Sequence, residues 1–186
     1  LRMPYSAEHL LNHVRKHFPN KKVAFVYEAG PTGYGLYDGI VAQGYPCLIA
    51  APSMIPKAPG QRVKTNRLDS KALSENLRGG QLQSIHVPSP TYRELRHLTQ
   101  LRDVLVSELA GMKQRIKSLL LFEGIEFPPA PAGSQWSFLV KDKLRKLACS
   151  GTVRFKLNQL LDSLEFNEKQ VLKAIREIRR YCHNDP

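Results

Sequence analysis

Two acidic side chains lie at the ends of predicted elements, where carboxylates can act as metal ligands. The first, Glu28, ends the apolar run KVAFVYE (22–28), which is typical of a buried strand in a parallel sheet. Functional groups gather at the carboxyl ends of such strands, and a carboxylate in a crevice is costly unless it is paired or bound to metal. A strand-end acid that simply points into solvent is the alternative.

The second acid, Asp69, lies in VKTNRLDSKALSENL (63–77), which predicts a helix over residues 67–78. Thr65 or Asn66 can cap this helix, and Asp69 then falls in its first turn, where the helix dipole favours an acid. Alternatively, Glu28 and Asp69 share Mg²⁺ or Mn²⁺, because hard cations take oxygen ligands and nucleases clamp two ions between carboxylates. In that case Asn66 lends a carbonyl oxygen but no charge.

The charge of the chain indicates a polyanionic partner. Its 186 residues include 28 Lys and Arg against 16 Asp and Glu, a net charge of +12, which is the electrostatic footprint of a nucleic-acid-binding protein. Lys113, Arg115 and Lys117 recur along one predicted helix, and further basic clusters occupy 141–146 and 176–180. Such side chains can follow a phosphate backbone, or they can be the solvated flank of a helix.

The first part of the chain predicts an α/β fold. Apolar runs rich in strand formers alternate with helical patterns, and this β-turn-α-β order indicates a parallel sheet that ends near residue 88. The predicted helices cover 7–18, 34–43 and 67–78, the strands cover 22–28 and 46–52, and 82–88 is extended.

The second part predicts an all-α antiparallel coiled-coil hairpin. Apolar residues follow a heptad pattern in two long segments, with Arg102 as the polar exception, and a loop (127–134) and a short helix (135–148) lie between them. The first seam consists of Leu95, Arg102, Leu109 and Ile116 together with Leu98, Leu105, Met112 and Leu119; the second consists of Leu157, Leu161, Leu164, Val171, Ile175 and Ile178. We therefore predict a domain over 1–88 and a helical region over 89–186.

Two further features exclude classes of protein. No run of about 18 apolar residues exists, so no membrane-spanning helix is expected. Cys47, Cys149 and Cys182 are odd in number and far apart, which fits a reducing compartment and excludes a Cys-x-x-Cys zinc site.

The order of these features resembles the insertion-sequence-one-ten family of transposases, which includes the Piv-type DNA invertases. The resemblance runs from about residue 20 to 182 and is carried by FVYEAGPTGYGLYDGIVAQGY, LIAAPSMIPKAPGQRVKTNRLDSKALSENLR, YRELRHLTQLRDVLV and MKQRIKSLL. It implies a RuvC-like, RNase H-type domain with an Asp-Glu-Asp-Asp metal site, followed by a coiled coil and a domain with a serine nucleophile.

The resemblance also assigns roles to individual residues. Glu28 matches the Glu of the tetrad, Asp69 matches its last Asp, and Asn66 occupies the position of the third acid. Lys64, Thr65 and Arg67 match the basic surroundings of that motif. Asn66 removes one negative charge from a site that must hold dications.

The same resemblance implies what the chain does and where. The first Asp of the tetrad is expected before residue 1 and the serine domain after residue 186, so we expect a fragment of a DNA transposase or site-specific recombinase, inactive alone. DNA, a guide (bridge) RNA and a second copy held through the coiled coil are the implied partners, in a bacterial or archaeal cytoplasm at the nucleoid. Two alternatives are a non-catalytic nucleic-acid-binding remnant and a dimerising coiled-coil scaffold.

Overall fold

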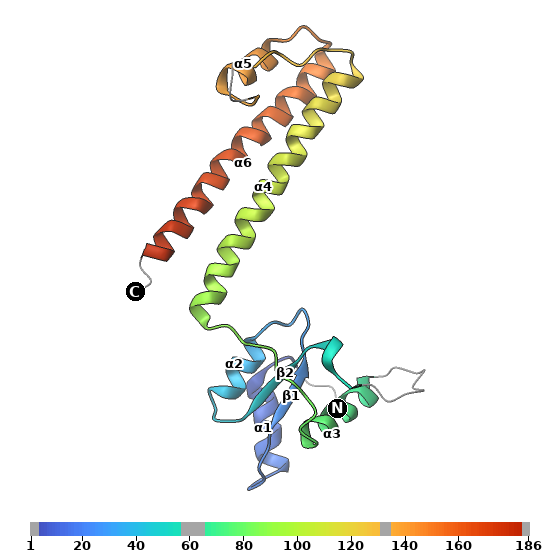
Figure 1. Cartoon of the computed structure of the whole chain (residues 1–186), viewed down its shortest axis with the longest axis vertical. Coiled ribbons are helices and arrows are strands. Elements are labelled where there is room, and N and C mark those ends of the chain that lie inside the picture. Colours follow the sequence, from blue (N-terminus) through green and yellow to red (C-terminus); the bar gives the residue numbers. More distant parts are fainter. Residues whose placement is uncertain (1–3, 57–65, 131–134, 184–186) are drawn as a thin grey trace. The chain divides into compact units, whose positions relative to one another are not determined.

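The computed structural model describes residues 4–56, 66–130 and 135–183, and the chain divides into two compact units, Leu1–Val87 and Pro88–Pro186. Figure 1 shows the strands in the first unit and two long helices in the second. The domain boundary predicted from the sequence lies between residues 88 and 89, one residue after the boundary between these two compact units.

The sheet of the first unit consists of two short parallel strands, β1 (Phe25–Glu28) and β2 (Cys47–Ala50). Their register pairs Phe25 with Cys47 and Glu28 with Ala50, so the parallel pairing predicted from the sequence is confirmed. Both strands are shorter than predicted. Strand β2 is limited on one side by a proline at 46, which has no N–H to donate, and on the other by the 3₁₀-helix η1 (Pro52–Met54).

Three helices accompany this sheet: α1 (Ala7–His17), α2 (Gly35–Val41) and α3 (Asn66–Arg78). Helix α2 connects the strands and packs against β2 and α1, whereas α3 packs against β1. A Cβ atom at Gly39 would lie 2.5 Å from the Cβ of Ala7, so glycine is what lets α1 and α2 approach. The buried core of this unit consists of Leu11, Val14, Ile40, Ile49 and Ala50.

The segment predicted to be extended over 82–88 runs beside β2. Ser84 forms an antiparallel bridge with Ala50, and the backbone N–H of Ile85 donates to the carbonyl oxygen of Ile49 at 2.9 Å. This segment therefore protects part of the outer edge of β2 before the chain enters the second unit.

The second unit contains α4 (Pro90–Phe122), α5 (Phe138–Lys146) and α6 (Gly151–His183). Helices α4 and α6 lie side by side and run in opposite directions (Figure 1). The chain enters α4 and α5 through serine caps: the hydroxyl groups of Ser89 and Ser137 each accept a hydrogen bond from a backbone N–H in the first turn. Gly124, with φ of 65°, turns the chain after α4.

The packed face between α4 and α6 follows the predicted apolar positions. The core consists of Ile116, Leu119, Leu120, Val140, Leu144, Leu157, Leu161 and Leu164. Toward the start of α4 the predicted seam residues are half-buried, except for Arg102, which is exposed. The half-buried residues are Leu95, Leu98, Leu105 and Leu109. The structure adds Asn167 and Ala174 to the buried face of α6. Heptad interlocking of the coiled-coil type, and pairing of two subunits through it, stay predictions.

Helix α5 is fastened to α6 by apolar and ionic contacts. Val140 and Leu144 are completely buried in the core of the unit. The ammonium group of Lys141 lies 2.6 Å from the carboxylate of Glu168, and these side chains are 11% and 30% exposed. Arg145 contacts the carboxylates of Asp162 and Glu165, and the hydrogen bond to Asp162 is the main reason why the pKa of Arg145 is raised.

Two polar contacts fix the alignment of α4 against α6. The buried amide of Asn167 donates to the carboxylate of Glu108 at 3.4 Å. Nearer the start of α4, the hydroxyl of Tyr181 donates to the carboxylate of Glu94 at 2.8 Å. Among the described residues, no helix has an apolar stretch long enough to cross a bilayer.

Candidate metal and nucleic-acid sites

Glu28 is the last residue of β1 and lies at the carboxyl end of the parallel pair. The strand pairing continues one step further, because the backbone N–H of Ala29 donates to the carbonyl oxygen of Ala50 at 2.8 Å. The Glu28 side chain is exposed, and no described residue forms a hydrogen bond or ion pair with its carboxylate. The strand pairing thus fixes the backbone at Glu28, and within the described ranges its carboxylate has no protein partner.

The turn after Glu28 is held by two tyrosine hydroxyl groups. Tyr27 donates to the carbonyl oxygen of Gly33 at 3.0 Å, and Tyr5 donates to that of Thr32 at 2.9 Å. Burial, followed by the nearby thiol of Cys47, raises the pKa of Tyr27 to about 12, so its hydroxyl keeps its proton to higher pH than that of an ordinary tyrosine. Gly33 has φ of 61°, a conformation that favours glycine.

Asp69 lies in the first turn of α3, the helix that packs against β1. Its carboxylate is exposed and, like that of Glu28, has no hydrogen bond or ion pair with a described residue. Arg67 is also exposed at this end of the helix. Asn66 begins α3, but its side chain, like all of Lys64, lies outside the described part of the chain.

The predicted metal ligands therefore come from neighbouring elements but do not form a complete site. Within the described ranges, no group of three or more His, Cys, Asp or Glu side chains is arranged to hold a metal ion. Two open carboxylates are the hard oxygen donors that Mg²⁺ and Mn²⁺ prefer, so the donor chemistry fits such an ion. Further ligands would have to come from water, a phosphate or other residues.

Two of the three predicted nucleic-acid-binding residues on α4 contact aromatic rings. The ammonium groups of Lys113 and Lys117 lie 5.9 Å and 6.0 Å from the ring centroids of Trp136 and Phe127, near the outer limit for a cation–π contact. Lys117 also donates to the side chain of Gln135 at 3.0 Å. Arg115 and Lys117 are exposed and Lys113 is half-buried, and no ring contact is described for Arg115, so these three residues do not share one environment.

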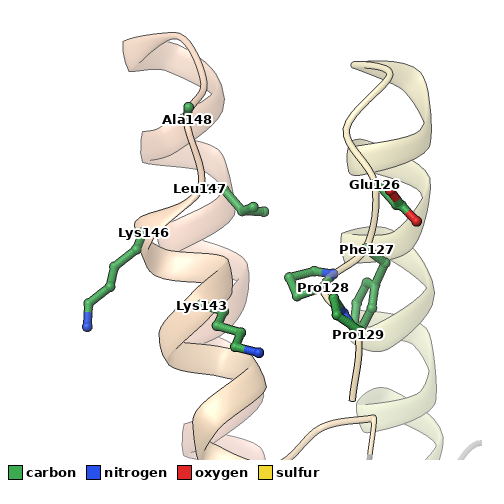
Figure 2. A pocket seen from close by; sticks show the side chains of 8 residues that line it. All are labelled: Glu126, Phe127, Pro128, Pro129, Lys143, Lys146, Leu147 and Ala148. Atoms are coloured by element: carbon green, nitrogen blue, oxygen red, sulfur yellow. The ribbon is translucent and has the colours of Figure 1, made fainter. Parts of the chain in front are cut away.

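A pocket lies between the segment after α4 and the end of α5. Figure 2 shows Lys143 and Leu147 reaching toward Pro128, whereas Lys146 points away. Its lining consists of Glu126, Phe127, Pro128, Pro129, Lys143, Lys146, Leu147 and Ala148. Lys146 forms an ion pair with Asp142 at 2.7 Å, so among the described lining residues Lys143 is the cation directed into this pocket (Figure 2).

Sequence reasoning did not identify the tyrosine contacts to the turn or the aromatic partners of the lysines. The hydroxyl groups of Tyr5 and Tyr27 donate to backbone carbonyl oxygens, and since every residue has one, the sequence does not show which residue is the acceptor. The ring centroids of Trp136 and Phe127 lie 5.3 Å apart in an edge-to-face contact. Phe127 comes from the predicted loop (127–134) and Trp136 from the start of the predicted short helix (135–148), and neither pattern indicates that the two rings meet. The single tryptophan of the chain was the available signal, because a lone aromatic beside a basic helix invites a cation–π contact.

Comparison with known proteins places these residues in a family. A family model described as a transposase, of the IS110 DEDD type, matches residues 3–123. The chain is 43% identical over 106 residues to y4qE of Sinorhizobium fredii (strain NBRC 101917 / NGR234), a candidate transposase by name; the match covers 57% of this chain and 27% of that protein. It is 31% identical over 104 residues to the transposase for insertion sequence element IS1533 of Leptospira borgpetersenii, covering 55% of this chain and 30% of that protein.

The family match and both relatives agree on the same class of protein, and the match covers Glu28, Asp69 and all of α4. Each alignment spans less than a third of the relative's own length. The chain therefore belongs to the DEDD transposase family of IS110.

Proposed function

We propose that this chain takes part in DNA transposition and supplies part of a divalent-metal site for DNA strand cleavage and exchange. Glu28 and Asp69 are the proposed metal ligands, and Asn66 adds a neutral oxygen. The observation that carries the proposal is the family match over residues 3–123, since DEDD transposases generally use divalent metal ions.

The placement of the two carboxylates supports this role. They belong to elements that pack against each other, β1 and α3, and both are free of protein partners in the described part of the chain. Both carboxylates are exposed, so a metal ion from solution can reach them without breaking a contact to a described residue. A bound metal ion at this position would stabilise the charge that develops on a phosphodiester during cleavage.

The proposal includes partners. DNA is the substrate of the proposed reaction, and Lys64, Arg67, Lys113, Arg115 and Lys117 are the proposed phosphate contacts. The proposal also includes two further partners, a guide RNA and a second copy of the chain paired through the hairpin. It places the protein at the nucleoid in the cytoplasm of a bacterium or archaeon.

A second candidate function is nucleic-acid binding without catalysis. The observation that favours it is the incomplete ligand set: the described residues hold no three-membered group that could bind a metal ion. In this case the carboxylates would be solvated ends of a strand and a helix, and the net charge of +12 would carry the function.

Metal binding distinguishes the two candidates. We would titrate the ¹⁵N-labelled chain with Mn²⁺ and follow paramagnetic line broadening of backbone amides. The first proposal predicts broadening centred on Glu28 and Asp69, with at least tenfold weaker binding in Glu28→Gln and in Asp69→Asn. Glu8→Gln, an exposed acid on α1, is the matched control and should leave the titration unchanged.

The opposite result would support the second candidate. If Mn²⁺ broadens no amide near β1 and α3, or if both substitutions leave the broadening unchanged, Glu28 and Asp69 do not hold a metal ion in this chain. Binding of DNA would then be the activity left to measure.

A further inference from the structure

Helix α6 carries a row of basic side chains on the face that is turned away from α4. Lys169, Lys173, Arg176 and Arg180 follow one another at spacings of four, three and four residues. At 100° per residue they fall within an arc of about 60° and span about 16 Å of the helix. All four are exposed, whereas Ala174 on the opposite side is buried. We call these four residues the α6 basic row.

Packing within the unit does not account for this row. Three of the four basic residues of α5 are used in ion pairs: Lys141 with Glu168, Arg145 with Asp162 and Glu165, and Lys146 with Asp142. In the α6 basic row only Arg180 has a described acidic partner, Glu177 on the same helix, and that pair is exposed. Three unpaired cations on one face raise the local potential and are a cost in free energy unless a polyanion neutralises them.

We propose that the α6 basic row is a docking surface for the phosphate backbone of double-stranded DNA. Four cations in a line over about 16 Å cover the length of about five phosphates of one strand, because one strand of the duplex advances about 3.4 Å per charge. The major groove of B-DNA, about 12 Å wide, admits a helix, whereas that of A-form RNA is deep and narrow. A helix face of this kind therefore suits a DNA duplex better than an RNA duplex.

This inference rests on the proposed function only in taking DNA as the partner. It concerns a helix that begins at residue 151, beyond the residues 3–123 matched by the transposase family. It also adds residues to the proposed phosphate contacts, which lie on α3 and α4 or just before α3. Phe166, 60% exposed and three residues before Lys169, extends the same face with an aromatic ring.

The test is the salt dependence of DNA binding by the complete 186-residue chain. Fluorescence anisotropy with a labelled 25-base-pair duplex of arbitrary sequence gives the dissociation constant at several NaCl concentrations. Each phosphate contact contributes about 0.9 to the slope of log K against log salt, so the triple variant Lys169→Gln, Lys173→Gln, Arg176→Gln should lower the slope by about 2.7. Glutamine keeps the helix propensity, and circular dichroism checks that α6 still forms.

The control removes the same charge elsewhere. Lys16→Gln, Lys21→Gln, Lys22→Gln changes three exposed lysines of the first unit and should leave the slope within about 0.5 of the unsubstituted chain. An equal loss in both variants, or no loss in the α6 variant, would overturn the proposal, as would tighter binding of an RNA duplex or of anionic vesicles that depends on the same lysines. The Mn²⁺ titration is independent of this row, so failure here and failure of the proposed metal site give different results.

Discussion

Replacing Leu144 by alanine tests whether α5 is held to the helical hairpin by its buried side chains. Leu144 is completely buried, and it shares with Val140 the only buried positions that α5 contributes to the core of the second unit. Loss of a buried leucine side chain costs its transfer free energy plus that of the cavity left behind. We expect Leu144→Ala to lower the free energy of unfolding of this unit by about 2 to 5 kcal/mol.

Trp136 provides a probe for this unit alone. It is the single tryptophan of the chain, and it lies in edge-to-face contact with Phe127 in the same unit. A chain with two compact units need not unfold in one step, so a local probe is required. With a urea m-value of about 1.5 kcal/mol/M, the midpoint of the fluorescence transition should fall by about 1 to 3 M.

Leu139→Ala is the matched control at an exposed position of the same helix. Leu139 is 60% exposed, so its truncation should change the free energy of unfolding by less than about 0.5 kcal/mol. Equal midpoints for Leu139→Ala and Leu144→Ala, or an unchanged midpoint for Leu144→Ala, would refute the docking of α5 described above.

Three further predictions follow from single residues. Gly39→Ala should destabilise the first unit by about 1 to 3 kcal/mol because the new methyl group collides with α1. Gly111→Ala, which has open space around it, should stabilise α4 by about 0.5 to 1 kcal/mol. Hydrogen exchange read separately for each unit should show changes in the free energy of unfolding with opposite signs. Because the pKa of Tyr27 is raised from 10.0 to about 12, the unfolded chain loses this proton first, and the first unit should lose stability as the pH rises from 10 to 12. The ultraviolet titration of the unsubstituted chain minus that of Tyr27→Phe should have its midpoint near pH 12. A midpoint near pH 10 would contradict this prediction. Lys141→Met breaks a mostly buried ion pair and should destabilise the second unit by about 1 to 3 kcal/mol. Lys146→Met breaks an exposed ion pair and should destabilise it by less than about 0.5 kcal/mol. Equal urea midpoints for the two variants would contradict this difference.

The helices and the parallel pairing could be predicted because apolar periodicity and turn residues determine them locally. Residues 67–78 were predicted as a helix, and α3 covers Asn66–Arg78. The strands were predicted too long, since an apolar run shows where a strand is possible but not how far its partner extends. The buried Asn167 was not predicted either, because its burial depends on Glu108 of the other helix, 59 residues away in the sequence.

The candidate sites were predictable only in part. Glu28 and Asp69 could be chosen from residue type and position, since carboxylates at the ends of elements are suited to metal binding. That β1 and α3 pack against each other is a tertiary contact, which no local pattern specifies. The different surroundings of Lys113 and Arg115 likewise depend on a ring supplied by Trp136 from the connecting segment.

The two contacts that align α4 with α6 limit how the hairpin can change its length in evolution. Glu94 with Tyr181 and Glu108 with Asn167 are cross-links between the arms, separated by 14 residues on each helix. An insertion in one helix between these two hydrogen bonds would shift the partner residues of one bond apart by the length of the insertion. The buried amide of Asn167 could then face a different side chain. Changes of length between them therefore have to occur in both arms together and by equal amounts, whereas residues can be added at the connecting segment around 127–130 without disturbing either contact.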